Sequence, residues 1–198
     1  MLETRPGVYF WQAPHPEWDP GENWPQVVTS YALDDGERLV VIDPLAPPPE
    51  LDQLAAGRDA VIVLTIPFHL RDTVALAQRL GAPVYAPPPL ADAPKVTDAT
   101  VFVAGERLPF GVETIRGIQD SDLLLWVEDF RALVIGDTLI DRGEGLIFPV
   151  DWAARVGAPE QLRRALLPLL ERDIDVVLPT HGLPGDVAAL ERALSGPR

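Results

Sequence analysis

The chain has 198 residues, of which 47% are apolar, and it carries a formal net charge of −14. A chain of this length can bury one substantial core, so we expect a single domain over residues 1–198. The strong negative charge repels nucleic acid and anionic membranes, which excludes both as partners. Cysteine is absent, so disulfides, thiolate metal ligands and cysteine nucleophiles are excluded as well.

The N-terminal residues lack the basic and apolar segments of a signal peptide. No apolar run reaches the ~20 residues that span a bilayer. We therefore expect a cytoplasmic protein. A small-molecule substrate is a possible partner. The sequence leaves open whether it is a monomer or a homodimer.

The first part of the chain predicts a strand, a long loop, a β-hairpin and a short helix. Residues 7–11 favour a strand, and residues 13–25 are too rich in Pro and Gly to be regular. Two strands at 27–33 and 38–43 are joined by Asp-Asp-Gly-Glu, which is typical of a hairpin turn. A short helix over residues 50–56 follows.

The centre of the chain is organised around a strand at residues 61–65. This strand is rich in β-branched residues and uncharged, so we expect both of its faces to be buried. A turn with His69, Arg71 and Asp72 follows, and an amphipathic helix then ends at Gly81.

The second half predicts more strands, a loop and two helices. Strands are expected at residues 83–86, 100–103, 111–115, 122–127, 131–135 and 175–178, with those between 100 and 135 in a second sheet. Residues 141–151 favour a loop. A helix over 159–172 is expected to be kinked or shortened by Pro168. A closing helix is expected over residues 186–194.

Three of the predicted strands end in polar residues that can carry chemistry. His69 follows the central strand, Asp137 follows the strand at 131–135, and His181 follows the last strand. We expect these three strand ends to form one site.

Five sequence blocks follow one another along the chain: Val-Val-Ile-Asp43, Val-Leu-Thr65 with its turn and helix, Gly-Ala-Pro-Val-Tyr-Ala86, Leu-Val-Ile-Gly-Asp137-Thr138 and Leu-Pro-Thr-His181-Gly182. The order of these blocks resembles that of the metallo-β-lactamase superfamily. The resemblance covers nearly the whole chain. It implies an α/β fold, a four-layer αββα sandwich of two mixed β-sheets, with the site along their shared edge.

The main metal motif of that family, His-x-His-x-Asp-His, is incomplete here. Its place is taken by Ile66-Pro-Phe-His-Leu-Arg-Asp72. One alignment sets His69 on the second histidine of the motif, with Arg71 and Asp72 on its acidic residue and last histidine. The other alignment sets Phe68 on that histidine and leaves no ligand.

The later ligand positions are better preserved. Gln119 is the nearest counterpart of the family's middle histidine, while Asp137 matches the bridging carboxylate and His181 the last histidine. Only three histidines occur in the chain, so a normal dinuclear site is excluded. The resemblance therefore implies a degenerate site with at most one metal ion.

Two functional hypotheses remain open. The first is a hydrolase of small esters, lactones or thioesters, with one zinc or iron ion held by His69, Asp137 and His181 and with Asp72 and Asp137 as catalytic carboxylates. The second is a metal-free pseudoenzyme that serves as a binding or interaction protein. In that hypothesis Arg71 pairs with Asp72 or Asp137 and replaces the charge of the metal.

Arg71, Gln119 and Trp152 are candidate substrate contacts. Other residues have two interpretations each. The tryptophans of residues 11–25 either line an apolar pocket together with Trp152 or only pack within their own loop. His15 is either a further ligand or part of that loop. The cluster at 120–122 is either an acid–base group or a solvated turn.

Overall fold

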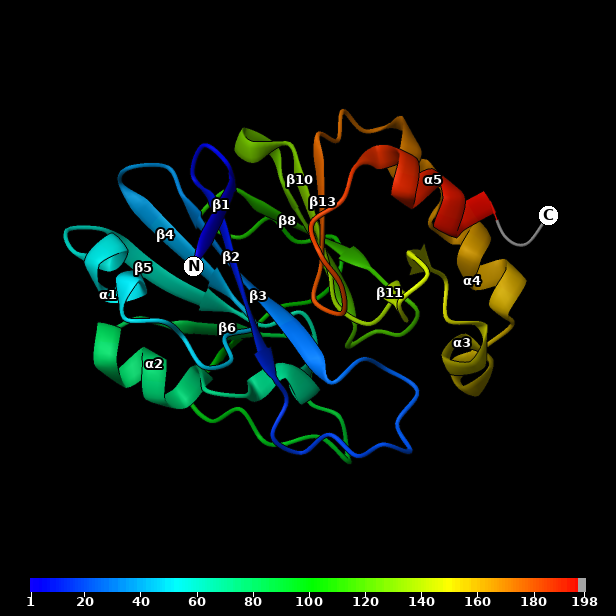
Figure 1. Ribbon diagram of the computed structural model, residues 1–198, viewed down its shortest axis with the longest axis horizontal. Helices are drawn as coiled ribbons and strands as arrows, with labels where there is room; N and C mark the ends of the chain where they lie inside the picture. Colours follow the sequence, from blue (N-terminus) through cyan, green and yellow to red (C-terminus); the bar gives the residue numbers. More distant parts are fainter. Residues whose placement is uncertain (196–198) are drawn as a thin grey trace.

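Residues 1–195, which the computed structural model describes, form two main β-sheets packed face to face between two layers of helices (Figure 1). The first sheet has the strand order β1-β2-β3-β4-β5-β6-β7, and the second has the order β13-β10-β9-β8. The strands of the first sheet are β1 (Leu2–Arg5), β2 (Val8–Pro14), β3 (Val27–Asp34), β4 (Arg38–Ile42), β5 (Asp59–Val63), β6 (Val84–Ala86) and β7 (Thr100–Val101). Those of the second are β8 (Val112–Arg116), β9 (Leu123–Val127), β10 (Ala132–Ile135) and β13 (Val176–Pro179).

Both sheets are mixed, as expected. In the first sheet, β1 to β4 are antiparallel neighbours, whereas β4 to β7 are parallel. In the second sheet, β8, β9 and β10 are antiparallel, and β13 lies parallel to β10. Parallel neighbours need crossover connections, and the helices provide most of these. The helices are α1 (Glu50–Ala55), α2 (Thr73–Leu80), α3 (Val150–Val156), α4 (Pro159–Ala165) and α5 (Val187–Ser195), with short 3₁₀ helices η1 (Pro67–Leu70), η2 (Glu128–Phe130) and η3 (Leu167–Glu171).

The main core lies between the two sheets. Side chains alternate along each strand, so Val40 and Ile42 of β4 belong to the core that they share with Leu123 and Leu125 of β9. The residues between them in β4 and β9 face outward and are also buried. Both sheets are therefore covered on both faces, which explains their uninterrupted apolar sequences.

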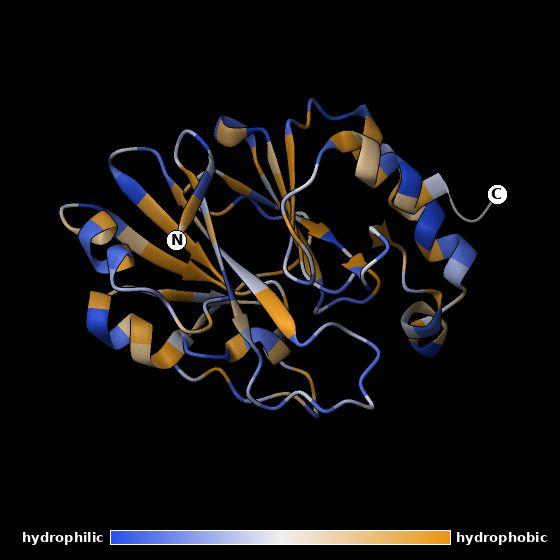
Figure 2. Cartoon of the chain, in the orientation of Figure 1, coloured by the Kyte–Doolittle hydropathy of each residue, from blue (hydrophilic) through white to orange (hydrophobic). Residues whose placement is uncertain are grey.

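The outward faces are covered by helices. Leu51 of α1 and Leu76 of α2 are buried against the first sheet, and Leu190 of α5 is buried against the second. Figure 2 shows apolar strands in the middle and helices that carry both polar and apolar faces. This arrangement confirms the predicted αββα layers.

Two predictions about single elements need correction, and one strand was not predicted. Segment 100–103 contributes β7, which pairs with β6 in the first sheet and not with the second, because Tyr85 and Thr100 are in register. Segment 141–151 is a hairpin of β11 (Ile140–Asp141) and β12 (Leu146–Ile147) followed by the start of α3, not an open loop. The edge strand β1 was not predicted, because its residues are largely exposed and show no apolar pattern.

Pro168 acts as predicted. Helix α4 ends at Ala165, and the chain continues as the 3₁₀ helix η3, which starts at Leu167 with the proline in its first turn. Within residues 1–195, no helix is long and apolar enough to cross a membrane.

Candidate metal centre

The three predicted site residues lie at the ends of three strands. His69 is on η1, directly after β5, whereas Asp137 follows β10 and His181 follows β13. Strands β10 and β13 are parallel neighbours with Ile135 opposite Pro179, so their ends lie side by side. The structure therefore brings Asp137 and His181 together through the register of the second sheet.

Hydrogen bonds between the two sheets position His69 beside Asp137 and His181. The Tyr31 hydroxyl donates to the Pro179 carbonyl (2.6 Å), and the Thr29 amide donates to the Thr180 carbonyl (2.8 Å). The Leu123 amide donates to the Thr65 carbonyl (2.9 Å). These bonds join β3 and the end of β5 to the edge of the second sheet.

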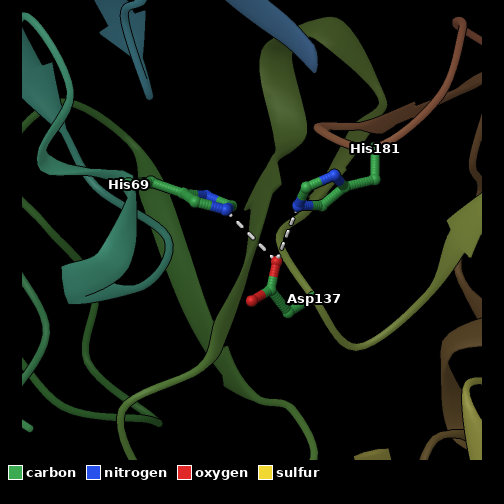
Figure 3. A group of neighbouring side chains, drawn as sticks. All are labelled: His69, Asp137 and His181. Carbon is green, nitrogen blue, oxygen red and sulfur yellow. Dashed lines mark ion pairs between the residues drawn. The ribbon is translucent and has the colours of Figure 1, made fainter. Parts of the chain in front are cut away.

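The imidazoles of His69 and His181 converge on one carboxylate oxygen of Asp137 (Figure 3). Asp137 Oδ1 lies 3.2 Å from His69 Nε2 and 3.3 Å from His181 Nε2. One ligand atom from each residue fits within a mutual distance of 4.8 Å. Both imidazoles are 5% exposed, so the group is closed to solvent on most sides.

This group fits a divalent metal ion. Asp137 Oδ1 is buried and has no hydrogen-bond partner in the described part of the chain, although two imidazoles face it. Bonds of about 2.0–2.2 Å from an ion to nitrogen and oxygen ligands place neighbouring ligand atoms about 3.0–3.5 Å apart. The separations of Asp137 Oδ1 from the two imidazole nitrogens fall in that range. Two histidines and one carboxylate also form a recognised ligand set for zinc or iron with open positions.

Asp43 fixes the orientation of His69. The carboxylate of Asp43 is fully buried and accepts hydrogen bonds from the Thr65 amide (2.9 Å), the Thr65 hydroxyl (2.5 Å) and His69 Nδ1 (2.9 Å). With Nδ1 bound to Asp43, His69 presents Nε2 to Asp137. A carboxylate behind a histidine in this way is the usual support of a metal-binding imidazole.

The charges of the site are strongly coupled. Burial and Arg71 oppose protonation of His69, but Asp43 and Asp137 outweigh them and raise the pKa of His69 to about 9. Burial alone would raise the pKa of Asp137, but the charge of His69 and the nearby His181 hold it well below its usual range. Burial lowers the pKa of His181. Without a metal, His69 therefore carries the positive charge that balances the carboxylates.

The group lies in the wall of a cleft of about 550 Å³. Besides the three candidate ligands, the lining includes apolar, aromatic and charged side chains: His15, Glu17, Glu22, Trp24, Ile66, Phe68, Arg71, Ile118, Gln119, Trp152, Arg155 and Val156. All three residues that we expected to contact a substrate, Arg71, Gln119 and Trp152, line this cleft. The volume suits a small molecule.

The predicted pairing of Arg71 with a site carboxylate is not found. Arg71 Nη1 instead donates to the main-chain carbonyl of Asp43 (2.9 Å), and its Nε and Nη2 have no hydrogen-bond partner among residues 1–195. Asp72 also differs from expectation, because its carboxylate accepts a hydrogen bond from the Ala46 amide (2.6 Å) and does not line the cleft. Asp72 therefore supports a turn and belongs neither to the three-residue group nor to the cleft lining.

The tryptophan-containing loop between β2 and β3 covers part of the site. The ring of Trp24 meets His181 edge-on, with ring centres 5.3 Å apart, and His15 meets Trp24 in the same way at 5.3 Å. Asn23 links this loop to α3, since its amide donates to Asp151 (2.5 Å) and accepts from the Trp152 indole (3.1 Å). His15 thus contacts the site through Trp24 and is outside the three-residue group.

Two buried carboxylates of the site were missed or undervalued. Asp43 ends a family-like sequence block and has no predicted role, although an aspartate directly after an apolar strand is itself a signal for a buried polar partner. Asp122 belongs to the cluster for which a solvated turn was one interpretation, but it is fully buried and accepts from the Thr138 hydroxyl (2.7 Å). Burial and the charge of Asp137 raise the pKa of Asp122 to about 8.

Gly136 precedes Asp137 and allows β10 to pass close to the end of β5. A Cβ atom at this position would lie 2.6 Å from Thr65 Oγ1 and 3.0 Å from Thr65 Cβ. We expect Gly136→Ala to reduce the free energy of unfolding by about 1–3 kcal/mol through overpacking. Chemical denaturation measures this change. The substitution Gly143→Ser in the exposed β11–β12 turn, where no atom lies within 4 Å of the added Cβ, tests the cost of strain without overpacking.

Comparisons with known proteins agree with the expected fold. No family model matches the sequence, and no curated protein matches it. Among solved structures, an archaeal metallo-β-lactamase superfamily protein from Sulfolobus tokodaii is 16% identical, with 96% of this chain and 85% of that chain covered at a TM-score of 0.69. A metallo-β-lactamase from Pontibacter korlensis is 19% identical, with 98% and 96% covered at a TM-score of 0.68. TTHA1623 in a di-iron-bound form is 23% identical, with 84% and 93% covered at a TM-score of 0.62.

Proposed function

Because the chain has the metallo-β-lactamase fold, we propose that it is a mononuclear metal-dependent hydrolase of small esters, lactones or thioesters. His69, Asp137 and His181 would hold one zinc or iron ion. The observation that carries the proposal is the convergence of two imidazole nitrogens on one oxygen of Asp137 in the wall of a cleft, where this oxygen has no hydrogen-bond partner among residues 1–195.

The residues of the chain have distinct parts in this proposal. A bound divalent ion would polarise a carbonyl group and lower the pKa of a coordinated water to about 7. Asp43 holds the His69 ring in place through Nδ1. Trp24 and Trp152 pack beside His181 and shield the centre from bulk water. Gln119 and Trp152 line the cleft and would orient the substrate.

Metal analysis of the purified protein tests the proposal. After incubation with zinc or iron(II) and removal of unbound ions, we expect about one ion per chain, as a single two-histidine, one-carboxylate set predicts. Hydrolysis of a panel of simple esters, lactones and thioesters should then depend on the ion and stop with a chelator. A metal content near zero after both incubations ends this proposal.

One observation favours the second candidate, a metal-free binding protein. The guanidinium of Arg71 adds a positive charge to the cleft, and together with protonated His69 it balances the charge of Asp137 without a metal. In this alternative the cleft binds a small molecule without turnover. Binding that persists unchanged in chelator-treated protein, together with no measurable metal, would favour it over the hydrolase.

A further inference from the structure

The planar guanidinium group of Arg71 makes hydrogen bonds along one of its edges and, within residues 1–195, none along another. Its Nη1 atom donates to the Asp43 carbonyl at 2.9 Å and lies 3.5 Å from the Thr29 carbonyl. Its Nε and Nη2 atoms are buried and have no hydrogen-bond partner within residues 1–195. These two N–H groups lie parallel on the same edge of the planar guanidinium, which is an edge that binds a carboxylate through two hydrogen bonds.

The same molecule shows this mode of binding elsewhere. Arg58 donates from Nε to Asp34 Oδ1 (2.8 Å) and from Nη2 to Asp34 Oδ2 (3.3 Å). The corresponding edge of Arg71 has no such partner in the described chain. Leaving buried, charged donors unpaired is costly, so a ligand that pairs with them gains that free energy on binding.

The nearest carboxylates of the chain are already engaged. Asp43 accepts from Thr65 and His69, Asp72 accepts from Ala46, and Asp137 faces the two imidazoles. Arg71 also has φ 41° and ψ −125°, a conformation that non-glycine residues rarely adopt. Such strain is concentrated at functional sites, where the surrounding structure enforces it.

The rest of the cleft indicates what a ligand would carry besides its carboxylate. Arg71 lines the cleft together with Trp24, Trp152, Phe68 and Ile118, which are apolar or aromatic. We propose that the cleft binds a small carboxylate with an apolar body: the side chains that cover the free Arg71 edge move aside on binding, the carboxylate accepts both of its N–H groups, and the body lies against the two tryptophans. This names a ligand class for the same cleft, so its use in catalysis rests on the proposed function, but its binding needs no metal.

Calorimetric titration of chelator-treated protein with two matched probes tests the proposal. Phenylacetate and phenylacetamide have nearly the same shape, but only phenylacetate offers two equivalent, charged acceptor oxygens. We expect phenylacetate to bind at least about tenfold more tightly, a difference of about 1.4 kcal/mol. Acetate should bind more weakly than phenylacetate because it lacks the apolar body. Equal affinities for phenylacetate and phenylacetamide, or no binding of phenylacetate, would overturn the proposal.

Variants then locate the carboxylate. Arg71→Gln should bring the affinities for the two probes to within about twofold of each other. Arg155→Gln makes the same change of charge at an exposed residue that lines the same cleft, and it should keep the preference for phenylacetate. A preference that survives in Arg71→Gln, or that is lost in Arg155→Gln, contradicts the assignment. If Arg71→Gln does not fold, Arg71→Lys takes its place: it keeps the charge but lacks the two parallel N–H groups, so it should lose most of the preference for phenylacetate, and a preference that it keeps contradicts the assignment.

The result of these titrations can be distinguished from the result of the tests for a metal-dependent hydrolase. The titrations use metal-free protein, so an absence of metal binding would end the hydrolase and leave the carboxylate preference intact. Conversely, a protein that binds one ion and hydrolyses esters, yet shows no preference for phenylacetate, would retain the proposed function and lose this inference.

Discussion

Asp137→Asn is expected to abolish metal binding while leaving the fold intact. The carboxylate oxygen that both imidazoles face would become an amide group, which is a poor ligand and cannot balance the charge of the ion. The loss of affinity should exceed the roughly 10–100-fold that follows from removing a hydrogen-bonding partner of a ligand. Calorimetric titration with zinc and the absorption spectrum of the cobalt(II)-loaded protein measure the effect.

The same variant should lose stabilisation by metal. At a free zinc concentration about 100 times its dissociation constant, the folded protein gains about 2.7 kcal/mol. Thermal unfolding of the unaltered protein should therefore shift upward with zinc, whereas that of Asp137→Asn should not. His15→Ala is the matched control, since it removes the one histidine outside the three-residue group. If Asp137→Asn keeps the affinity and spectrum of the unaltered protein, the ion is bound elsewhere.

The fold was predictable because its signals are local and repeated. The uncharged β-branched strand β5, the Asp34–Glu37 turn of the β3–β4 hairpin and the Gly81 stop of α2 each have a direct physical cause in the sequence. Edge elements were less predictable. Strand β7 has two exposed residues, so only its pairing with β6 decides to which sheet it belongs.

The site was only partly predictable, because strand ends identify residues but not the partners of their side chains. His69, Asp137 and His181 converge as the strand-end pattern indicates. Arg71 and Asp72 do not pair as expected, since the positive φ of Arg71 and the bond from Ala46 to Asp72 depend on contacts between distant segments. Asp43 was missed for the same reason, because its three donors come from a segment that starts 22 residues later.

Asp43→Ala should be the most destabilising substitution of a polar residue at the site. The change removes the acceptor of the Thr65 amide, the Thr65 hydroxyl and His69 Nδ1, all of which are buried. It also removes one of the negative charges that face His69 and Arg71. Removing one partner of a buried, charged network costs about 3–5 kcal/mol. Chemical denaturation of chelator-treated protein gives this value without a contribution from metal.

Two further variants separate burial from hydrogen bonding. Asp35→Ala also removes an aspartate that accepts two backbone amides, those of Glu37 and Arg38, but on the exposed hairpin turn, and it should cost only about 1 kcal/mol. Asp43→Asn keeps the shape and one acceptor oxygen, so its cost should lie between those of the two alanine variants. Asp43→Asn should also weaken zinc binding by about 10–100-fold, because His69 loses the carboxylate that orients it. An Asp43→Ala protein as stable as Asp35→Ala would show that Asp43 does not organise the site, and His69 would then need another cause for its orientation.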